Sequence, residues 1–299
     1  MPSAAPILRK AVLPVAGAGT RFLPVTKAVA KELLPVVDRP LVSYAVEEAV
    51  AAGVSEIIFI TAPGKPAIQD YFSPAPALEA LLAERGETHR LEVLRAAVPA
   101  GVRFSYVQQD RPLGLGHAVA CARALVGEEP FAVLLPDELL RGDPPCLAAM
   151  ATAWRRAGGN CVAALEVPAA DVSRYGVIAP AGPANDDGLI PLAGMVEKPA
   201  PEDAPSNLML PGRYILQPRL FHHLAAGRRG AGGEIQLTDA MAALLAEQPV
   251  FAYRFDGQRF DCGGKAGFLA ANLALALERP ELAAEVRQLL AGLTPAADA

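Results

Sequence analysis

Ala16-Gly17-Ala18-Gly19-Thr20-Arg21 opens a loop, residues 16–31, that follows an apolar run predicted to form a buried strand at residues 11–15. The two glycines let the backbone turn sharply off this strand and present bare N–H groups. Arg21, Lys27 and Lys31 add three positive charges within the same loop. These features together predict a loop that holds phosphate groups.

Two other kinds of glycine-rich loop do not fit the spacing. A dinucleotide-binding loop needs a third glycine, then a helix and a strand that ends in an acidic residue about 20 positions on. Asp38 has that spacing, but Pro24, Pro35 and Pro40 leave no room for the intervening helix and strand. A P-loop would end in Gly-Lys-Ser or Gly-Lys-Thr, and the segment contains neither.

Composition indicates an ordinary soluble globular protein: the chain has 299 residues, of which 52% are hydrophobic and 20% charged. A net charge of −5 argues against a general nucleic-acid surface, so the cations near Arg21 indicate a local site. No apolar stretch approaches the length of a membrane span, and Met1 to Ala5 lack the apolar core of a signal peptide. We therefore expect a cytoplasmic protein without nucleic-acid or membrane partners.

The cysteines and lysines carry different amounts of information. Four widely spaced cysteines form no Cys-x-x-Cys pair, which favours small buried residues over a zinc site or disulfides. Only six of the 27 basic residues are lysines, and the compact ammonium group suits contact with a single phosphate oxygen. The lysines are Lys10, Lys27, Lys31, Lys65, Lys198 and Lys265.

The order of the elements predicts an α/β fold with a doubly wound sheet. Apolar runs predict strands at residues 56–60, 103–107, 131–135 and 161–167, with helices at 41–52 and 145–157 and a helical segment at 66–98. Beyond residue 167 the expected elements are extended pieces at 176–179, 194–197 and 208–216, a helix at 234–246, a strand at 250–255, a helix ending near 278, and a frayed end at 291–299.

Ligands of such sheets bind at the carboxyl ends of the strands. The phosphate loop, residues 109–117 and Asp137 all follow predicted strands and should meet there. A carboxylate at the end of an apolar strand suits Mg²⁺, which takes one or two carboxylates and fills its other positions with phosphate and water oxygens. The alternative for Asp137 is a turn or helix cap, and Asp261 has the same ambiguity.

Residues 109–117 predict a place for a planar base. Gly114 and Gly116 give an unobstructed backbone at a helix start, and Gln109 offers the amide donor and acceptor that a pyrimidine edge requires. A solvent-facing glutamine beside a simple helix-start turn is the alternative, and His117 is interpreted as a packing or capping residue rather than a base. Glu32 should face ribose or base, since phosphates would repel it, or else form a surface ion pair.

Glu197-Lys198-Pro199 ends a short extended piece. The carboxylate of Glu197 would accept sugar hydroxyls while the ammonium of Lys198 meets a phosphate. A solvated ion pair remains the alternative.

Taken together, these segments resemble the bacterial UTP–glucose-1-phosphate uridylyltransferases among the sugar-1-phosphate nucleotidyltransferases, over about residues 8 to 290. The motif Gly17-x-Gly19-Thr20-Arg21 followed by Pro24 and then Lys carries the resemblance at the start of the chain. The other resembling segments are Lys31–Pro35, Gly114–Ala118, Leu135–Asp137, Tyr175–Val177, Val196–Pro199, Pro205–Asn207, Gly212-Arg213-Tyr214, Gly233–Asp239 and Asp261–Gly263.

The resemblance implies a Rossmann-like doubly wound mixed sheet of the nucleotide-diphospho-sugar transferase type. It implies a single domain over residues 1–299, with a nucleotide-binding part at 8–167 that carries the helical insertion 66–98, and a sugar-binding and C-terminal part at 168–290. It also implies a homodimer or homotetramer.

The activity implied is Mg²⁺-dependent transfer of a uridylyl group from UTP to glucose-1-phosphate, which gives UDP-glucose and pyrophosphate. The residues implied to hold the nucleotide are Ala16, Gly17, Ala18, Gly19, Thr20, Arg21, Glu32, Gln109, Gly114 and Gly116. Those implied to act in catalysis are Arg21, Lys31, Asp137, Lys198 and Asp261, with Asp137 and Asp261 on Mg²⁺. Gly176, Glu197 and Lys198 are implied to hold the sugar phosphate.

Two alternatives remain open. A catalytically silent relative that binds sugar nucleotides would be expected to lose a metal carboxylate or a phosphate cation, and this chain keeps them. An enzyme of the same type that uses dTTP or another sugar phosphate is harder to exclude. Ala30, where the resembling enzymes often have proline, and residues 110–112 beside the base pocket bear on nucleotide preference only.

Overall fold

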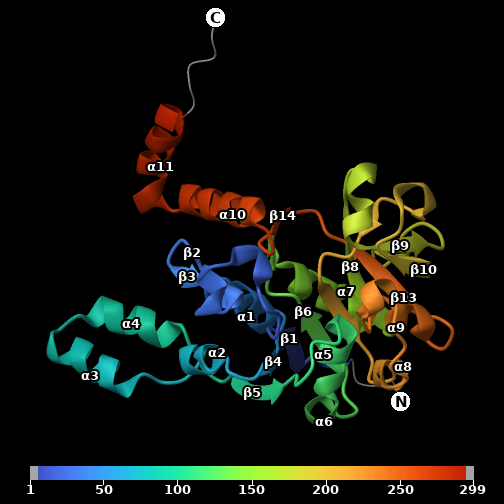
Figure 1. Cartoon of the computed structure of the whole chain (residues 1–299), viewed down its shortest axis with the longest axis horizontal. Helices are drawn as coiled ribbons and strands as arrows, with labels where there is room; N and C mark the ends of the chain where they lie inside the picture. Colours follow the sequence, from blue (N-terminus) through green and yellow to red (C-terminus); the bar gives the residue numbers. More distant parts are fainter. Residues whose placement is uncertain (1–5, 294–299) are drawn as a thin grey trace, which may run out of the picture.

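A ten-stranded mixed sheet runs through the computed structural model, which describes residues 6–293 (Figure 1). Its strand order is β11-β9-β10-β13-β8-β12-β6-β1-β4-β5. The strands are β1 (Lys10–Pro14), β4 (Glu56–Thr61), β5 (Arg103–Gln108), β6 (Phe131–Leu134), β8 (Asn160–Glu166), β9 (Gly176–Pro180), β10 (Leu189–Glu197), β11 (Leu208–Met209), β12 (Arg213–Leu216) and β13 (Val250–Arg254). The predicted class, a doubly wound mixed α/β sheet, is confirmed.

The strands predicted from the first apolar runs form the parallel half of the sheet. β1 pairs in parallel with β4 on one side and β6 on the other, and β4 pairs in parallel with β5. Every residue of β4 and β6 is buried, because helices cover both faces of a parallel sheet. The carboxyl ends of β1, β5 and β6 therefore point toward one edge, where the loops with the predicted site residues emerge.

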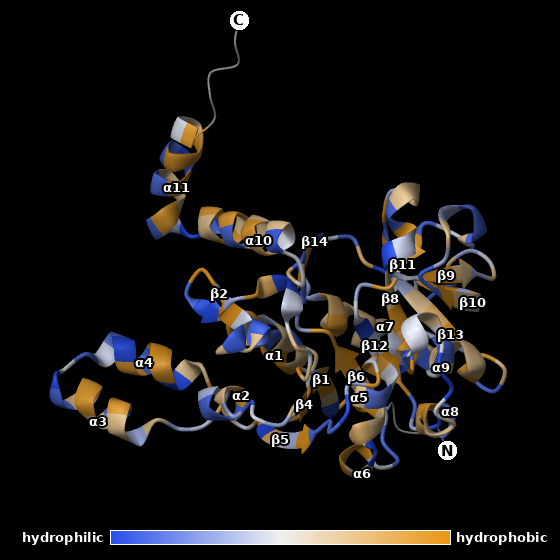
Figure 2. Ribbon diagram, in the orientation of Figure 1, coloured by the Kyte–Doolittle hydropathy of each residue, from blue (hydrophilic) through white to orange (hydrophobic). Residues whose placement is uncertain are grey.

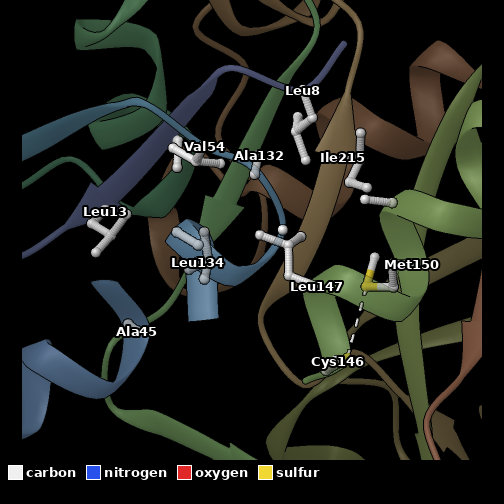
Figure 3. Close-up of a cluster of buried hydrophobic side chains, with 14 of the residues drawn as sticks. Leu8, Leu13, Ala45, Val54, Ala132, Leu134, Cys146, Leu147, Met150 and Ile215 are labelled. Atoms are coloured by element: carbon white, nitrogen blue, oxygen red, sulfur yellow. Dashed lines mark hydrogen bonds between the residues drawn. The ribbon is translucent and has the colours of Figure 1, made fainter. Parts of the chain in front are cut away.

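Side chains alternate between two cores. Leu13 and Leu134 face the first core under α1 (Leu41–Ala51), α2 (Ala67–Tyr71) and α7 (Cys146–Ala157) (Figure 3). Val12 and Val133, one residue earlier, face the second core under α5 (Leu115–Cys121), α6 (Arg123–Val126), α8 (Leu220–Ala225) and α9 (Leu237–Leu244). This alternation is the period of two that a strand imposes. Figure 2 shows apolar residues, in orange, concentrated in the central strands of the sheet around β6.

The second half of the chain joins the same sheet with mixed direction. β12 runs antiparallel between β6 and β8, whereas β13 runs parallel to β8. β10 pairs antiparallel with both β13 and β9. Strands from residues 8–167 and from residues 168–290 thus share one sheet, and the division of the domain at residue 167 stays a prediction.

Several helices lie away from the two helix-covered faces of the central sheet. The helical segment predicted at 66–98 contains α2, α3 (Pro76–Glu84) and α4 (Thr88–Ala96), and α3 and α4 project from the body as a hairpin (Figure 1). α10 (Lys265–Glu278) is followed by α11 (Pro280–Leu293). α8 and α11 were not predicted. The expected frayed end is wrong for residues 291–293, which are helical, and its remainder, residues 294–299, lies outside the described residues.

Two small antiparallel ribbons complete the fold. β2 (Pro35–Val36) pairs with β3 (Arg39–Pro40) in the turn-rich stretch before α1. β7 (Glu138–Arg141) pairs with β14 (Gln258–Asp261), with Asp261 opposite Glu138. The second ribbon was not predicted, and it brings Asp261 beside the end of β6. Leu139 and Cys262 from this ribbon pack with Leu275 of α10 in a third apolar cluster.

Within residues 6–293, no helix combines the length and the apolar character needed to cross a membrane.

Candidate active site

A cleft of about 410 Å³ opens at the carboxyl ends of β1 and β6. Its walls come from both halves of the sheet: Arg21, Leu115, Leu135, Asp137, Glu138, Arg174, Tyr175, Gly176, Glu197, Leu210, Tyr214, Gln236, Thr238 and Asp261. A larger cavity of about 610 Å³ lies along α8 and α9, but it contains none of the predicted site residues. The convergence of the predicted residues, rather than cavity size, identifies the first cleft as the candidate site.

The phosphate loop turns through Gly19, whose φ of +65° only glycine adopts without strain. The hydroxyl of Thr26 donates a hydrogen bond of 2.8 Å to the carbonyl of Gly19 and closes the turn. Lys65, which follows β4, donates to the carbonyls of Gly17 and Val15. The loop that carries Ala16, Gly17, Ala18, Gly19 and Thr20 is thus held from inside and from the neighbouring strand.

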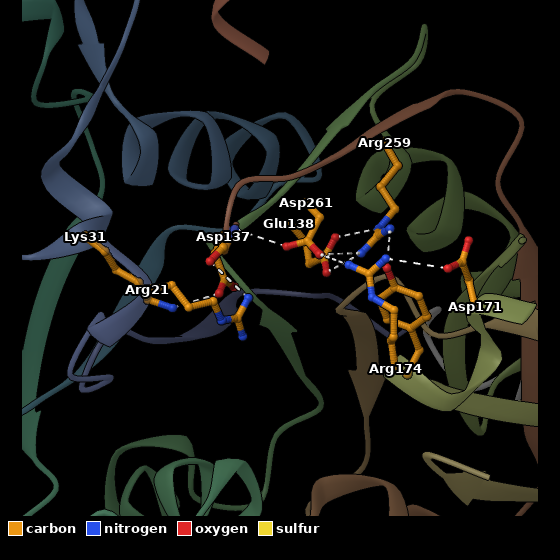
Figure 4. A network of polar contacts seen from close by, with 10 residues as sticks. Arg21, Lys31, Asp137, Glu138, Asp171, Arg174, Arg259 and Asp261 are labelled. Carbon is orange, nitrogen blue, oxygen red and sulfur yellow. Dashed lines mark hydrogen bonds and ion pairs between the residues drawn. The ribbon is translucent and has the colours of Figure 1, made fainter. Parts of the chain in front are cut away.

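Lys31 and Asp137 form an ion pair at the end of β6, with Nζ and Oδ2 separated by 2.7 Å (Figure 4). Burial disfavours the charged form of Asp137, but the adjacent Lys31 outweighs it and lowers the pKa of the carboxyl below its ordinary value. Burial likewise opposes the charge on Lys31, yet Asp137 and Glu32 raise the pKa of its ammonium group. Both groups are therefore charged at neutral pH.

Arg21 of the phosphate loop reaches the same point. Its Nη1 donates to the carbonyl of Gly263 at 2.9 Å. A Cβ placed on Gly263 would lie 3.0 Å from Nη1 of Arg21, 3.1 Å from Oδ2 of Asp137 and 3.1 Å from Oδ1 of Asp261. One cation and two carboxylates therefore surround the bare backbone of Gly263. Lys27, the third cation of the predicted loop, is exposed to solvent instead.

Asp261 holds its place through both carboxylate oxygens. Oδ1 accepts a hydrogen bond of 3.1 Å from the N–H of Gly263. Oδ2 accepts one of 3.1 Å from Nη2 of Arg174 and lies 3.9 Å from Nη2 of Arg259 (Figure 4). The alternative of a simple turn cap accounts for Oδ1 but not for the position of this residue beside Asp137.

The carboxylates of Asp137 and Asp261 fit the magnesium ion that the resemblance implies. Among the described residues, no group of three or more histidine, cysteine, aspartate or glutamate side chains is arranged to hold a metal ion. Two carboxylates on one side of an open cleft are the set that Mg²⁺ uses when phosphates and water complete its coordination. Asp137 and Asp261 would hold such an ion, and the assignment stays a prediction.

Gln109 is buried beside the start of α5 rather than facing solvent. Its Nε2 donates to the carbonyl of Gly114 at 3.2 Å and lies 2.9 Å from Nδ1 of His117. His117 thus forms a hydrogen bond with Gln109, and its interpretation as a packing or capping residue stays a prediction. Leu115, between the two glycines, lines the cleft and connects this group with the phosphate side.

The sequence predicts an unobstructed backbone at Gly114 and Gly116. This prediction is wrong for the side of the backbone on which residues 234–236 lie. A Cβ on Gly114 would lie 2.8 Å from Cβ of Glu234, and one on Gly116 would lie 2.8 Å from the carbonyl oxygen of Ile235. The N–H of Gly116 donates to that carbonyl at 2.8 Å. The close approach of residues 234–236 therefore requires glycine at both positions.

Glu32 is buried, with 1% of its side chain exposed, so the alternative of a surface ion pair is excluded. Its Oε1 lies 3.8 Å from Nζ of Lys31, and its Oε2 has no hydrogen-bond partner among the described residues. Burial raises the pKa of Glu32 to about 7, although Lys31 and Lys65 oppose the shift. A carboxyl in this state can accept or donate a hydrogen bond close to neutral pH.

Gly176 and Glu197 lie opposite each other in the pairing of β9 with β10. Oε2 of Glu197 accepts a hydrogen bond of 2.6 Å from the hydroxyl of Thr238, and a Cβ on Gly176 would lie 2.9 Å from that hydroxyl. Lys198 follows with a φ of +50°, and its backbone N–H donates to the carbonyl of Tyr175 at 2.9 Å. Its half-exposed ammonium lies 3.6 Å from Oε1 of Glu197, so the solvated ion pair exists in the free protein.

Sequence reasoning missed the residues that join the two sides of the cleft. Glu138 binds Arg259 through two hydrogen bonds of 2.6 and 2.7 Å. Arg259 also donates to the hydroxyl of Tyr175 at 3.2 Å and stacks over its ring (Figure 4). Thr238 is missed as well. Tyr175 and Thr238 stand in resembling segments, but nothing in the sequence marks Arg259, since it lies in an unpredicted strand.

The comparisons with known proteins show the family of the chain. The family model described as nucleotidyl transferase matches residues 10–278. The chain belongs to the nucleotidyl transferase family. It is 44% identical over 286 residues to a UTP–glucose-1-phosphate uridylyltransferase of Bacillus subtilis, with 96% of this chain and 97% of that protein covered. It is 43% identical over 287 residues to that of Streptococcus pneumoniae, with 95% of each chain covered.

Members of this family with solved structures share the fold of the whole chain. A UTP-bound UGPase from Acinetobacter baumannii superposes with a TM-score of 0.89 at 42% identity and covers 96% of this chain and 100% of that one. A UDP-glucose pyrophosphorylase complexed with UDP-glucose superposes with a TM-score of 0.82 at 40% identity, over 91% of this chain and 100% of that one. The resemblance read from the motifs is thereby confirmed.

Proposed function

We propose that this chain transfers the uridylyl group of UTP to glucose-1-phosphate and releases pyrophosphate. The observation that carries the proposal is the convergence of Arg21, Asp137 and Asp261 around Gly263, in the same cleft as Gly176 and Glu197. The residues proposed to bind the triphosphate and those proposed to bind the sugar thus meet in one cleft. The printed names of the relatives, and the UTP and UDP-glucose bound by two similar structures, support the same reaction.

The cations position the nucleotide. Arg21 and Lys31 meet the triphosphate, while the loop from Ala16 to Thr20 offers its backbone. The uridine lies toward Gln109, Gly114 and Gly116, with Glu32 behind the loop. Gln109 is fixed by Gly114 and His117, so its amide is already oriented before the nucleotide binds.

The sugar phosphate lies on the other wall. Glu197 accepts hydroxyl groups of the glucose and keeps its orientation through Thr238, and the missing side chain of Gly176 lets Glu197 and Thr238 come together there. Lys198 neutralises the sugar phosphate as that phosphate approaches the triphosphate. Its side chain is half exposed in the free protein and is therefore free to turn from Glu197 toward a phosphate.

The reaction is a direct displacement. An oxygen of the glucose-1-phosphate phosphate forms a bond to the α-phosphorus of UTP, and the bond from that phosphorus to the bridging oxygen of pyrophosphate breaks with its electron pair. No protein nucleophile is needed. Cys262 next to the site is 1% exposed, and burial raises the pKa of its thiol to about 12, so it does not act as one.

Mg²⁺ on Asp137 and Asp261 would neutralise the developing negative charge on the phosphate oxygens. In the free protein Lys31 and Arg174 occupy these carboxylates, at 2.7 and 3.1 Å. Lys31 keeps the pKa of Asp137 below its ordinary value, and the two cations hold both carboxylates in place in the free protein.

The proposal includes assembly and location. A homodimer or homotetramer, the assembly implied by the resemblance, has apolar surface available on the projecting helices, where Leu78, Leu81, Val93 and Leu289 are exposed.

We propose a cytoplasmic enzyme, because both substrates are highly charged metabolites that do not cross membranes unaided.

A panel of nucleotides and sugar phosphates tests the proposal. Purified protein with Mg²⁺ is incubated with UTP, dTTP, CTP or GTP and with glucose-, galactose- or mannose-1-phosphate, and products are followed by phosphorus NMR. UTP with glucose-1-phosphate is expected to give UDP-glucose and pyrophosphate in equal amounts at the highest rate. A higher rate with dTTP would replace the nucleotide assignment, and the absence of product in every combination would favour a silent relative.

A further inference from the structure

Arg213 belongs to the resembling segment Gly212-Arg213-Tyr214, to which no role has been assigned above. It begins β12, and only 1% of its side chain is exposed. A buried guanidinium is costly unless each side of it is paired. The partners of Arg213 therefore show what the protein gains from keeping it.

One side of the guanidinium is paired with Glu48 of α1. Nε and Nη2 of Arg213 donate to Oε2 of Glu48 at 3.0 and 2.9 Å. The other oxygen of Glu48, Oε1, accepts a hydrogen bond of 3.0 Å from the N–H of Leu147 near the start of α7. The charge on Arg213 is thus neutralised, and the pair connects two helices of the first core.

The other side of the guanidinium holds the chain around Asp137. Nη1 donates to the carbonyl of Leu135 at 3.1 Å, and Nη2 donates to the carbonyl of Glu138 at 2.7 Å. These two carbonyls stand immediately before and after the dipeptide Pro136-Asp137. The planar fork of one side chain therefore fixes both ends of the turn that carries the carboxylate.

Gly212 completes this support. The N–H of Leu135 donates to its carbonyl at 2.9 Å, and Nη1 of Arg213 also reaches this carbonyl at 3.3 Å. Gly212 has a φ of +74°, and a Cβ there would lie 2.8 Å from Cβ of Leu135. Only glycine allows β12 to approach the end of β6 this closely.

We propose that Arg213 is a positioning residue for the metal carboxylate Asp137, acting through the carbonyls of Leu135 and Glu138. The inference rests on the proposed function, because that function gives Asp137 its metal. Lys31 attracts the carboxylate of Asp137 from the side of the cleft, and Arg213 holds the backbone against that attraction from the side of the core. A lysine would keep the charge opposite Glu48 but lacks the planar fork that reaches two carbonyls at once.

Three variants separate positioning from stability. Arg213→Lys keeps the charge and loses the fork. The double variant Arg213→Met with Glu48→Gln removes both buried charges, a replacement that often leaves stability unchanged. Glu48→Gln alone leaves Arg213 on the two carbonyls but unpaired in the core, and so serves as the control that loses stability without losing the contacts at the turn.

Three measurements are made on each variant and on Asp137→Asn. Binding of Mn²⁺ is followed by the electron paramagnetic resonance of the free ion with UDP-glucose present, after subtraction of the ion bound by UDP-glucose alone. Hydrogen exchange of a peptide spanning residues 135–141 reports the mobility of the turn without any metal. Thermal unfolding of each protein gives the stability.

We expect Arg213→Lys and the double variant to weaken Mn²⁺ binding by about tenfold or more, the usual effect of residues that orient a metal ligand, and to speed exchange at residues 135–141. Glu48→Gln should lower the melting temperature most while its Mn²⁺ affinity stays within about twofold of the wild type, since it keeps the carbonyl contacts. The double variant should recover the melting temperature without recovering the Mn²⁺ affinity.

The inference is overturned if Mn²⁺ affinity follows melting temperature across the variants, or if exchange at residues 135–141 is unchanged in Arg213→Lys. If wild type and Asp137→Asn bind Mn²⁺ equally, the metal assignment of the proposed function fails instead. The exchange data then decide on their own whether Arg213 holds the turn.

Discussion

Asp261 lies opposite Glu138 in the ribbon formed by β14 and β7. Because Glu138 directly follows Asp137, this register places the two carboxylates predicted to share a metal on the same side of the cleft. The ribbon is fixed by the double hydrogen bond between Arg259 and Glu138 and by the packing of Leu139 and Cys262 beneath α10. The relative position of Asp137 and Asp261 thus depends on elements that supply neither the cations proposed to bind phosphate nor the residues proposed to bind the sugar.

The space beside Gly263 gives the first prediction. In Gly263→Ala the new methyl group would lie 3.0 to 3.1 Å from Arg21, Asp137 and Asp261, so these groups must move apart. We expect the rate of pyrophosphate release to fall by about 10- to 100-fold, with little change in melting temperature, since displaced electrostatic groups cost that order of magnitude.

Gly264→Ala is the matched control, because its methyl group would meet only the carbonyl of Asp261 at 3.9 Å. It should retain nearly the wild-type rate. Equal losses in both variants would show that the turn, rather than the space at Gly263, matters.

Lys198 should contribute to the binding of one substrate only. Replacing Lys198 with alanine removes the ammonium that lies 3.6 Å from Glu197. We expect the KM for glucose-1-phosphate to rise by about tenfold, the effect of one charge-assisted contact of 1.4 kcal/mol, while the KM for UTP changes little. A rise confined to UTP in initial-rate measurements would assign Lys198 to the nucleotide instead.

Glu32 should make stability depend on pH. Its pKa is raised to about 7 in the folded protein, so between pH 4.5, the ordinary value, and pH 7 the folded protein keeps a proton that the unfolded chain has lost. The free energy of unfolding therefore decreases as the pH rises through this range. Above pH 7 Glu32 is ionised in the folded protein too, and the full cost of burying its charge is reached. At pH 8.5 that cost is about 2 to 4 kcal/mol.

Glu32→Gln should remove this dependence in protein without metal or nucleotide. Its melting temperature relative to the wild type is expected to increase from pH 5 to pH 8.5. Glu84→Gln, at an exposed position of α3, should show a constant difference and serves as the control. A constant difference for Glu32→Gln would mean that Glu32 is ionised throughout this range.

The strands and helices that were predicted are those whose side chains repeat with a clear period. β4 and β6 are continuous apolar runs, and α1 presents a wide apolar face, so burial alone fixes them. β7 and β14 were missed because each has only four residues, and Glu138 and Arg259 interrupt any apolar pattern. Their pairing depends on a contact between segments far apart in the sequence.

The candidate site was predictable at charged residues that follow strand ends, since such residues need a ligand or an oppositely charged partner. The positions of Arg21 and Asp137 follow from strand ends, since ligands gather there. The burial of Glu32 did not follow, because carboxylates are normally exposed unless a tertiary structure encloses them. Arg213 likewise carries no sign in the sequence that its fork reaches Leu135 and Glu138.

Turnover by Asp137→Asn shows most directly whether paired carboxylates and cations bring the two phosphates together. The substitution keeps the size of the side chain but removes the charge that meets Lys31 at 2.7 Å. Pyrophosphate release from UTP and glucose-1-phosphate with Mg²⁺ is measured beside Asp186→Asn, an exposed control. We expect a loss of at least about 100-fold for Asp137→Asn and none for Asp186→Asn; full activity of a correctly folded Asp137→Asn would show that this carboxylate is not needed for the reaction.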